Sequence, residues 1–463
     1  MPEEILEKFF YPRSLAIIGA TRTPGFGFGI PAFLKRQGWL ERTYLVNPKG
    51  GEIEGRKVYT SIEELPGGID LAVVMVRAEL VPEVLAELGR KGIRRVIIES
   101  AGFAEIGEKE RQEELLRIAR EYGIRIIGPN CVGVVNTENR FATIEVIDKA
   151  LEPGGVAIIA QSGVFGNILL DHLPSQGIKI AKVATLGNKI DLDEADFLEY
   201  FALDGQVRVI MVYQEGVKDG KRFISALKSA CRKKPVVILK SGRTPFGSRA
   251  TLSHTGSLSG EDRIYDGAYQ QAGAIRAENL QEMLAVVRAL SQQPAMKGKK
   301  VGIITTSGSL GAMCADALYQ AGFQLSDWSL ETIQELKRIA PGWINLKNPL
   351  DVGPSGIFAQ ALKIILRDPN PDAYILIPVI PYGAIEIWRR LGLQAGMYFG
   401  NWKEMLGKTP DKPVLAILLG YPDFIEELKE LAGDRITTFS SPELAVKSLS
   451  ALFRARLCSH FYK

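Results

Sequence analysis

Histidine and cysteine are both scarce in this 463-residue chain, which has three of the first and four of the second. No two cysteines have the spacing of metal ligands, so we expect free thiols in a reducing cytoplasm and no metal site. The net charge of +4 is small for this length and gives no reason to expect nucleic acid or a membrane surface as a partner. No apolar run reaches the ~20 residues that a membrane-crossing helix needs.

Short β-branched runs alternate with amphipathic stretches along the whole chain. Such runs, separated by helices, predict parallel sheets covered on both faces. The fold class we expect is therefore α/β, with three doubly wound units. A Rossmann-like domain over 1–135 is followed by flavodoxin-like domains over 151–292 and 300–463. Residues 136–152 look irregular, and the segment 292–300 is interpreted as a linker.

The second and third units open with the same motif. Ser162–Gly166 and Ser307–Gly311 both read Ser-Gly-x-x-Gly, and each follows an apolar strand. Flavodoxin-like units in general share a strand–turn–helix start, but the paired motif is more specific. Free N–H groups at a helix start attract phosphate, so the two starts could hold one phosphate or receive a histidine-bound phosphate in turn. Ser162 with Gly163 and Ser307 with Gly308 stand at these two helix starts.

A glycine-rich loop, Gly19–Gly29, follows the first expected strand but resembles a dinucleotide fingerprint only loosely. The second strand should end in Asp or Glu if the chain bound NAD, and it ends in Asn47 instead. Arg22 and Lys49 add positive charge to these loops. A phosphate-rich ligand other than NAD is favoured, and coenzyme A fits. The alternative is that Lys49 is an ordinary surface lysine in a turn.

One histidine, His254, lies within Ser248–Gly260, a hydroxyl-rich and glycine-punctuated stretch that predicts a loop. An imidazole there can approach phosphates and carry a phosphoryl group. Glu215 ends a strand of the same unit and could orient the ring. The alternatives are an ordinary turn histidine and a solvated strand-end charge. In the third unit, the segment Trp343–Pro354 is either the lining of a pocket for a small acid or a structured loop.

Taken in order, several motifs resemble those of the succinyl-CoA synthetase superfamily. They are Ile127–Asn130, Gln161–Gly163, Gln214–Gly216, Ser253–Gly256 and Lys347–Asp351. The resemblance covers essentially the whole chain and is closest to the α subunit of ADP-forming acetyl-CoA synthetases. An extra C-terminal α/β domain distinguishes the chain from the shorter succinyl-CoA synthetase α subunit.

The resemblance implies a reaction and its residues. Acyl-CoA and phosphate give an acyl phosphate and free CoA, His254 becomes phosphohistidine with Glu215 orienting it, and ADP then receives the phosphoryl group. We expect His254 to move between sites on a mobile loop. The residues that fall where the family binds CoA or acetyl-CoA are Gly19, Thr21, Arg22, Asn47, Lys49, Val76 and Asn130. The resemblance also implies a set of phosphate-binding residues at the two helix starts, namely Ser162, Gly163, Ser307, Gly308 and Ser309.

A partner subunit is also implied. The chain has no Walker A motif, and its three units leave no ATP-grasp domain, so ADP/ATP and Mg²⁺ are expected on an ATP-grasp β subunit, in an α2β2 heterotetramer. The acid substrate is a small carboxylic acid whose acyl group the sequence does not identify, and GDP use stays open. The competing hypothesis is a non-catalytic CoA-binding or regulatory protein of the same fold.

Overall fold

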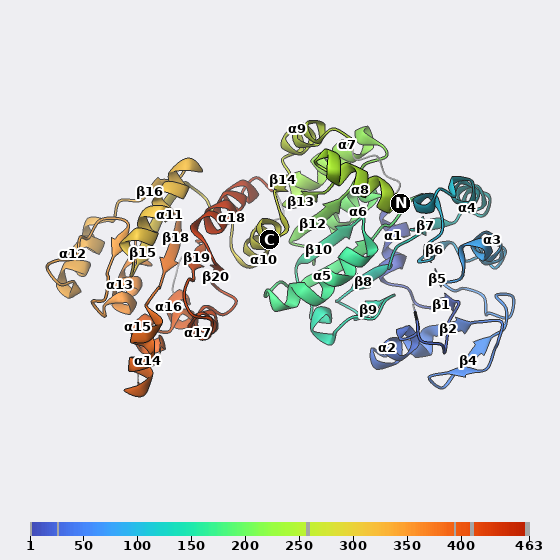
Figure 1. Cartoon of the computed structure of the whole chain (residues 1–463), viewed down its shortest axis with the longest axis horizontal. Coiled ribbons are helices and arrows are strands. Elements are labelled where there is room, and N and C mark those ends of the chain that lie inside the picture. Colours follow the sequence, from blue (N-terminus) through green and yellow to red (C-terminus); the bar gives the residue numbers. More distant parts are fainter. Residues whose placement is uncertain (1, 26, 256–259, 393–394, 408–411, 459–463) are drawn as a thin grey trace. The chain divides into compact units, whose positions relative to one another are not determined.

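The computed structural model describes residues 2–25, 27–255, 260–392, 395–407 and 412–458. The chain forms two compact units, residues 1–280 and 281–463 (Figure 1). The first unit contains two mainly parallel sheets and the second unit contains one. This arrangement confirms the expected fold class of one Rossmann-like sheet followed by two flavodoxin-like sheets. None of the helices in the described ranges combines the length and apolar composition that a bilayer crossing needs.

The first sheet has the strand order β3-β4-β2-β1-β5-β6-β7. Its strands β1 and β5 are wholly buried, because LAII and LAVV present apolar side chains to helices on both faces. The chain order reverses between β1 and β5, and ligands of open α/β sheets bind at such a point. The strands are β1 (Leu15–Ile18), β2 (Thr43–Val46), β3 (Glu52–Ile53), β4 (Arg56–Tyr59), β5 (Leu71–Val74), β6 (Arg95–Ile98) and β7 (Arg125–Ile127). The helices are α2 (Ile30–Arg36), η1 (Leu40–Arg42), η2 (Ala78–Leu80), α3 (Val81–Arg90), η3 (Ala104–Ile106) and α4 (Lys109–Tyr122).

The second sheet has the order β14-β13-β12-β10-β11-β8-β9. Its five parallel strands follow the flavodoxin order, and the chain reverses between β10 and β12. The strands are β8 (Val134–Asn136), β9 (Phe141–Ala142), β10 (Val156–Ala160), β11 (Ile180–Thr185), β12 (Val209–Gln214), β13 (Val236–Lys240) and β14 (Ile275–Ala277). The helices are η4 (Asp148–Leu151), α5 (Gly163–Ser175), α6 (Glu194–Leu203), α7 (Gly220–Lys233), α8 (Pro245–Thr255) and α9 (Asp262–Ala272).

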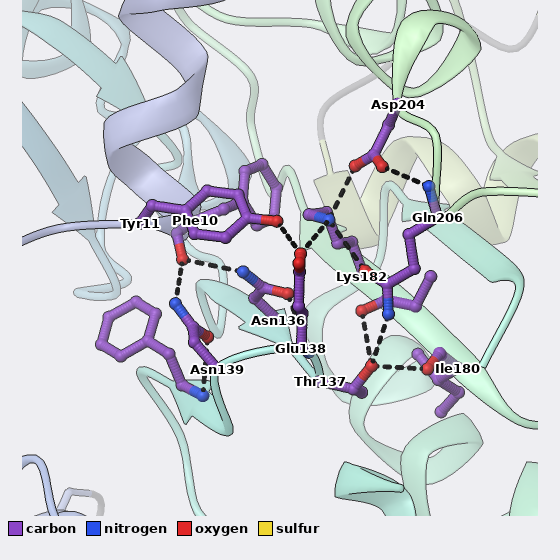
Figure 2. A network of polar contacts seen from close by, with 12 residues as sticks. Phe10, Tyr11, Asn136, Thr137, Glu138, Asn139, Ile180, Lys182, Asp204 and Gln206 are labelled. Atoms are coloured by element: carbon purple, nitrogen blue, oxygen red, sulfur yellow. Dashed lines mark hydrogen bonds and ion pairs between the residues drawn. The ribbon is translucent and has the colours of Figure 1, made fainter. Parts of the chain in front are cut away.

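The expectation that 136–152 is irregular was wrong in part. Strands β8 and β9 form an antiparallel edge of the second sheet, and η4 follows them. The N-terminal helix α1 (Pro2–Phe10) contacts β8 and α6. Figure 2 shows the polar contacts there: Asn136 Nδ2 and Asn139 Nδ2 both donate to the carbonyl of Phe10, at 3.1 and 3.0 Å. The buried Lys182 ammonium lies 2.7 Å from Asp204 Oδ2 in the same network. Since these contacts are long-range in sequence, periodicity gave no sign of them.

The expected loop around His254 also needs correction. The structure places Pro245–Thr255 in helix α8, so the backbone of His254 is helical. The hydroxyl-rich composition favours turns, but Thr251 Oγ1 bonds the carbonyl of Gly247, four residues earlier, at 3.0 Å. That bond gives the hydroxyl a partner within the helix. Residues 256–259 of the predicted stretch lie outside the described residues.

The second unit has the sheet order β16-β15-β18-β19-β20, with β17 also pairing β15. Its strands are β15 (Lys300–Thr305), β16 (Gln324–Leu325), β17 (Leu350–Asp351), β18 (Ala373–Ile377), β19 (Val414–Ile417) and β20 (Thr437–Phe439). Its helices are α10 (Leu280–Gln292), α11 (Gly308–Gln320), α12 (Leu330–Ile339), α13 (Phe358–Ile365), α14 (Tyr382–Arg390), α15 (Ala395–Phe399), α16 (Trp402–Leu406), α17 (Pro422–Ala432) and α18 (Pro442–Ala455).

The segment 292–300 is packed into this unit and does not behave as a free linker. Gln293 accepts a bond from Val414 N and donates one to the Arg435 carbonyl, both at 2.9 Å. Ala295 and Met296 are buried. The second unit therefore starts before the predicted residue 300, with α10.

Candidate active site

The loops that follow β1 and β2 meet at the switch point of the first sheet. Gly19 has φ +100°, and a side chain there would place its Cβ 2.9 Å from the Met75 carbonyl oxygen. Asn47 Nδ2 donates to the Ala20 carbonyl at 2.8 Å, so this residue ties the two loops together. Glycine at position 19 therefore allows the backbones to approach closely, as a ligand-binding turn requires.

Arg22 fixes the turn that carries Lys49. Its guanidinium donates to the carbonyls of Gly50 at 2.7 Å and Glu52 at 2.8 Å. The side chain of Lys49 is exposed at this edge, where it can meet an anionic ligand. The structure thus brings the two predicted cations onto adjoining loops, with Arg22 also serving to shape the turn.

Thr21 and Val76 lie at the same edge. Thr21 Oγ1 accepts a bond from Thr23 N at 3.0 Å and so shapes the first loop. Val76 lies against Gly19, with its Cγ1 3.2 Å from where a Cβ on that glycine would be. The Val76 carbonyl accepts a bond from Ser100 Oγ at 2.5 Å, which joins the loops after β5 and β6.

A cavity of about 220 Å³ lies in the first unit and unites residues of both its sheets. Asn130, which follows β7, contributes from the first sheet and has φ +60°. Ser162 and Gly163 contribute from the start of α5. The lining residues are Glu99, Ala101, Asn130, Cys131, Val132, Gln161, Ser162, Gly163, Val164 and Gly187. One CoA candidate and two phosphate candidates therefore share one cavity.

The start of α5 lines the cavity. Ser162 is the N-cap, and its Oγ accepts from Phe165 N at 3.4 Å. A Cβ on Gly163 would lie 3.3 Å from Val132 N, so the helix start packs closely on the chain that follows Asn130. The first N–H groups of a helix have no intrahelical acceptor. They point out of the N-terminal end of the helix, which is also the positive end of the helix dipole. A phosphate in the cavity would meet these groups.

Gln161 connects the cavity to Glu215. Its Oε1 accepts bonds from the backbone N–H groups of Glu215 at 2.8 Å and Gly216 at 3.0 Å. Lys189 Nζ also donates to this oxygen at 3.2 Å, to the Gly216 carbonyl at 2.5 Å, and to the carboxylate of Glu194. Gln161, Lys189 and Glu194 are all buried. The turn after β12, which carries Glu215, is thus held rigidly beside the turn after β10.

Glu215 is 2% exposed, and Tyr213 Oη donates to its Oε1 at 3.3 Å. Burial is the main cause that raises the pKa of Tyr213, so the phenol stays a donor at neutral pH. Helix α8, which bears His254, contacts η3, and η3 begins three residues after the cavity residue Ala101. The side chain of His254 lies outside the described part of the chain, so its pairing with Glu215 stays a prediction.

Glu99 was missed by the reasoning from sequence. It follows β6, is 4% exposed and lines the cavity. Burial, followed by repulsion from Glu145, raises the pKa of Glu99 well above its usual value. The signal was available, because Glu99 ends an expected parallel strand just as Glu215 does.

Ser307, Gly308 and Ser309 lie in the second unit and start helix α11. The hydroxyls of Ser307 and Ser309 are 3.0 Å apart. A Cβ on Gly308 would lie 2.7 Å from Asp351 Oδ2, so a carboxylate stands beside this helix start. The paired Ser-Gly-x-x-Gly motifs therefore both start helices, α5 directly after β10 and α11 directly after β15. Each of these strands is the first of the parallel strands in its own sheet. The side chain of Ser162 caps its helix, whereas that of Ser307 makes no capping bond.

Two family models match the first unit. A CoA binding domain matches residues 13–137, and a succinyl-CoA ligase like flavodoxin domain matches residues 153–290. With the fold and the cavity, these matches define the class as a CoA ligase built from a CoA-binding and a flavodoxin-like domain.

Similar proteins narrow the class. The α subunit of ADP-forming acetate–CoA ligase II of Pyrococcus furiosus is 39% identical over 459 residues, with 97% of each chain covered. ADP-forming acetate–CoA ligase II of Archaeoglobus fulgidus is 40% identical over 382 residues, which are 80% of this chain and 56% of that one. The structure of acetyl-coenzyme A synthetase 1 of Ca. Korarchaeum cryptofilum with phosphate and ADP has a TM-score of 0.86, at 30% identity, covering 100% of this chain and 98% of that one. The chain belongs to the family of ADP-forming acetate–CoA ligases.

Proposed function

We propose that this chain is the α subunit of an ADP-forming acyl-CoA synthetase. The enzyme converts acyl-CoA, phosphate and ADP reversibly into a small carboxylic acid, CoA and ATP. The observation that carries this proposal is the cavity that joins Asn130 of the first sheet to Ser162 and Gly163 of the second. A CoA thioester entering from one side would meet phosphate held on the other, which is the geometry that phosphate attack on the thioester needs.

The CoA phosphates would lie at the loops after β1 and β2. Glycine at position 19 allows close backbone approach there, and Lys49 and Arg22 supply positive charge. The acyl carbonyl then falls in the cavity, where N–H groups at the start of α5 can stabilise the charge that develops during attack.

The resulting acyl phosphate would react with His254. The imidazole nitrogen attacks phosphorus, the bond from phosphorus to the carboxyl oxygen breaks, and the acid leaves. Glu215 would accept a bond from the other ring nitrogen and fix the tautomer. The rigid turn that Gln161 and Lys189 hold supports this role, because an orienting group must not move when its partner does.

The phosphoryl group then passes to ADP on a partner subunit. The Pyrococcus furiosus relative is named as a subunit alpha, which supports a β partner. We propose an ATP-grasp chain with Mg²⁺, an α2β2 assembly and a cytoplasmic location, with the four free cysteines agreeing with a reducing compartment. Substantial ATP formation by the pure chain from acetyl-CoA, phosphate and ADP would contradict the need for a partner.

Labelling tests the function directly. The chain is incubated with acetyl-CoA and radiolabelled phosphate, and we expect an acid-labile, base-stable phosphoprotein. His254→Ala should take up no label. Equal label in wild type and His254→Ala would refute the assignment, and no label in wild type would favour a non-catalytic CoA-binding protein.

A further inference from the structure

Glu99, a residue of the cavity wall, has a buried carboxyl group without a partner among the described residues. Glu99 is 4% exposed, and neither of its carboxyl oxygens has a hydrogen-bond partner within the described residues. A buried polar group without a partner is unfavourable, because it has lost its bonds to water and gained none in exchange. Because Glu99 lines the same cavity as Ser162 and Gly163, a bound substrate could supply the missing partner.

The surroundings of Glu99 keep its proton in place. A Cβ on Gly133 would lie 3.2 Å from Glu99 Oε1, so the chain closes over the carboxyl group. The titratable groups that face it are the Glu145 carboxylate and the Cys131 thiol. Burial and Glu145 raise the pKa of Glu99, and burial followed by Glu99 raises the pKa of Cys131. Among the described residues, neither of these two neighbours supplies a positive charge to a Glu99 anion. Glu99 therefore offers one O–H donor and one free acceptor oxygen.

The cavity is where bonds to sulfur would change. Asn130 and Glu99 come from the CoA-binding sheet, whereas Ser162 and Gly163 come from the phosphate side. A thioester lying between them would place its sulfur towards the first sheet and its carbonyl towards the start of α5.

We propose that Glu99 is the acid–base residue that exchanges the proton of the coenzyme A thiol, an inference that rests on the proposed function. Phosphate enters as HPO₄²⁻, its oxygen bonds to the thioester carbon, and the carbon–sulfur bond breaks. Glu99 gives its proton to the departing sulfur and takes up the proton that the phosphate hydroxyl loses, so the carboxyl group ends protonated. In reverse, sulfur attacks the acyl carbon and the bond from this carbon to the phosphate oxygen breaks. The carboxyl group then gives its proton to the departing phosphate and takes up the thiol proton, so it again ends protonated.

Two labelling routes separate this step from the rest of the reaction. Acetyl-CoA with radiolabelled phosphate requires the sulfur step, whereas radiolabelled acetyl phosphate reaches His254 without it. Glu99→Gln keeps the volume and neutrality of the protonated group, so the fold and the CoA dissociation constant should be retained. We expect its labelling rate from acetyl-CoA to fall at least about 100-fold and its rate from acetyl phosphate to stay within about 2-fold.

The pH dependence of the labelling rate from acetyl-CoA adds a second test, because a purely structural role of Glu99 would leave this dependence unchanged. The wild-type rate from acetyl-CoA should fall as rising pH removes the Glu99 proton, and the residual rate of Glu99→Gln should lack this limb. Glu145→Gln is the matched control, and it should keep both labelling routes. Because it removes the repulsion from Glu145 that raises the pKa of Glu99, the fall in rate from acetyl-CoA should move to lower pH. Full labelling of Glu99→Gln from acetyl-CoA would overturn the proposal, as would loss of both routes. If the wild type takes up no label from acetyl-CoA with phosphate and none from acetyl phosphate, the proposed function itself is refuted.

Discussion

The buried ion pair between Lys189 and Glu194 gives the sharpest test of how the turn that carries Glu215 is held. Both side chains are 2% exposed, and Lys189 Nζ also bonds Gln161 Oε1 and the Gly216 carbonyl. In Lys189→Met, the Glu194 carboxylate stays buried without its counter-ion, and two oxygens lose a donor. Removing one partner of a buried pair costs about 3–5 kcal/mol, and we expect a loss of free energy of unfolding of that size.

The double variant distinguishes the charge effect from packing. Lys189→Met with Glu194→Leu removes both charges, and such replacements are often neutral, so it should recover most of the loss. Urea unfolding read by hydrogen exchange of peptides from residues 1–280 measures this unit separately from residues 281–463. Lys221→Met, at an exposed position of α7, is the control and should change stability by less than about 0.5 kcal/mol. A cost below about 1 kcal/mol for Lys189→Met, or a double variant no more stable than the single one, would refute the reasoning.

Three further variants test other parts of the structure. Because burial raises the folded-state pKa of Glu99 well above its usual value, the stability that Glu99 contributes falls as pH rises above its unfolded pKa. Glu99→Gln does not titrate, so its free energy of unfolding should gain on the wild type by up to about 1.4 kcal/mol per pH unit as pH rises from about 5. A difference in urea unfolding that does not change with pH would count against a buried neutral acid. Gly187 has φ +55°, and a Cβ at this position would lie 2.2 Å from the Pro129 carbonyl oxygen. Gly187→Ala should therefore displace the cavity wall and weaken CoA binding, measured by calorimetry, by more than about 10-fold. An unchanged dissociation constant would contradict this reasoning. Asn348→Ala removes three hydrogen bonds: two that the amide donates to the carbonyls of Val301 and Ser326, and one that it accepts from Ile303 N. The free energy of unfolding of the second unit, measured by hydrogen exchange, should fall by about 2–4 kcal/mol. A loss under about 1 kcal/mol would contradict this role of Asn348.

Asn348 shows what the sequence left open. The segment Trp343–Pro354 was interpreted either as a pocket lining or as a structured loop. The structure uses Asn348 to hold β15 in place, with bonds of 2.7 to 3.0 Å to main-chain atoms of this strand and its neighbour. A side chain in a turn-rich stretch gives no sign in sequence of which distant strand it will reach.

The prediction of a loop around His254 was wrong for a different physical reason. Ser, Thr and Gly favour turns in isolation, but α8 lies against η3 of the first sheet domain. Tertiary packing outweighs the weak helix propensity of these residues. The phosphorylation of His254, its movement and its contact with Glu215 all stay predictions.

The sequence by itself determined the three doubly wound sheets, because buried β-branched strands and amphipathic helices differ in period. It also placed Gly19, Asn47, Ser162 and Glu215 at strand ends, since parallel strands present their carboxyl ends at one edge. The tertiary structure alone decided which strand ends meet. It joined Asn130 to Ser162 and Gly163 in one cavity, tied Gln161 to the Glu215 turn, and buried Glu99 without a partner, because these depend on packing between segments far apart in the chain.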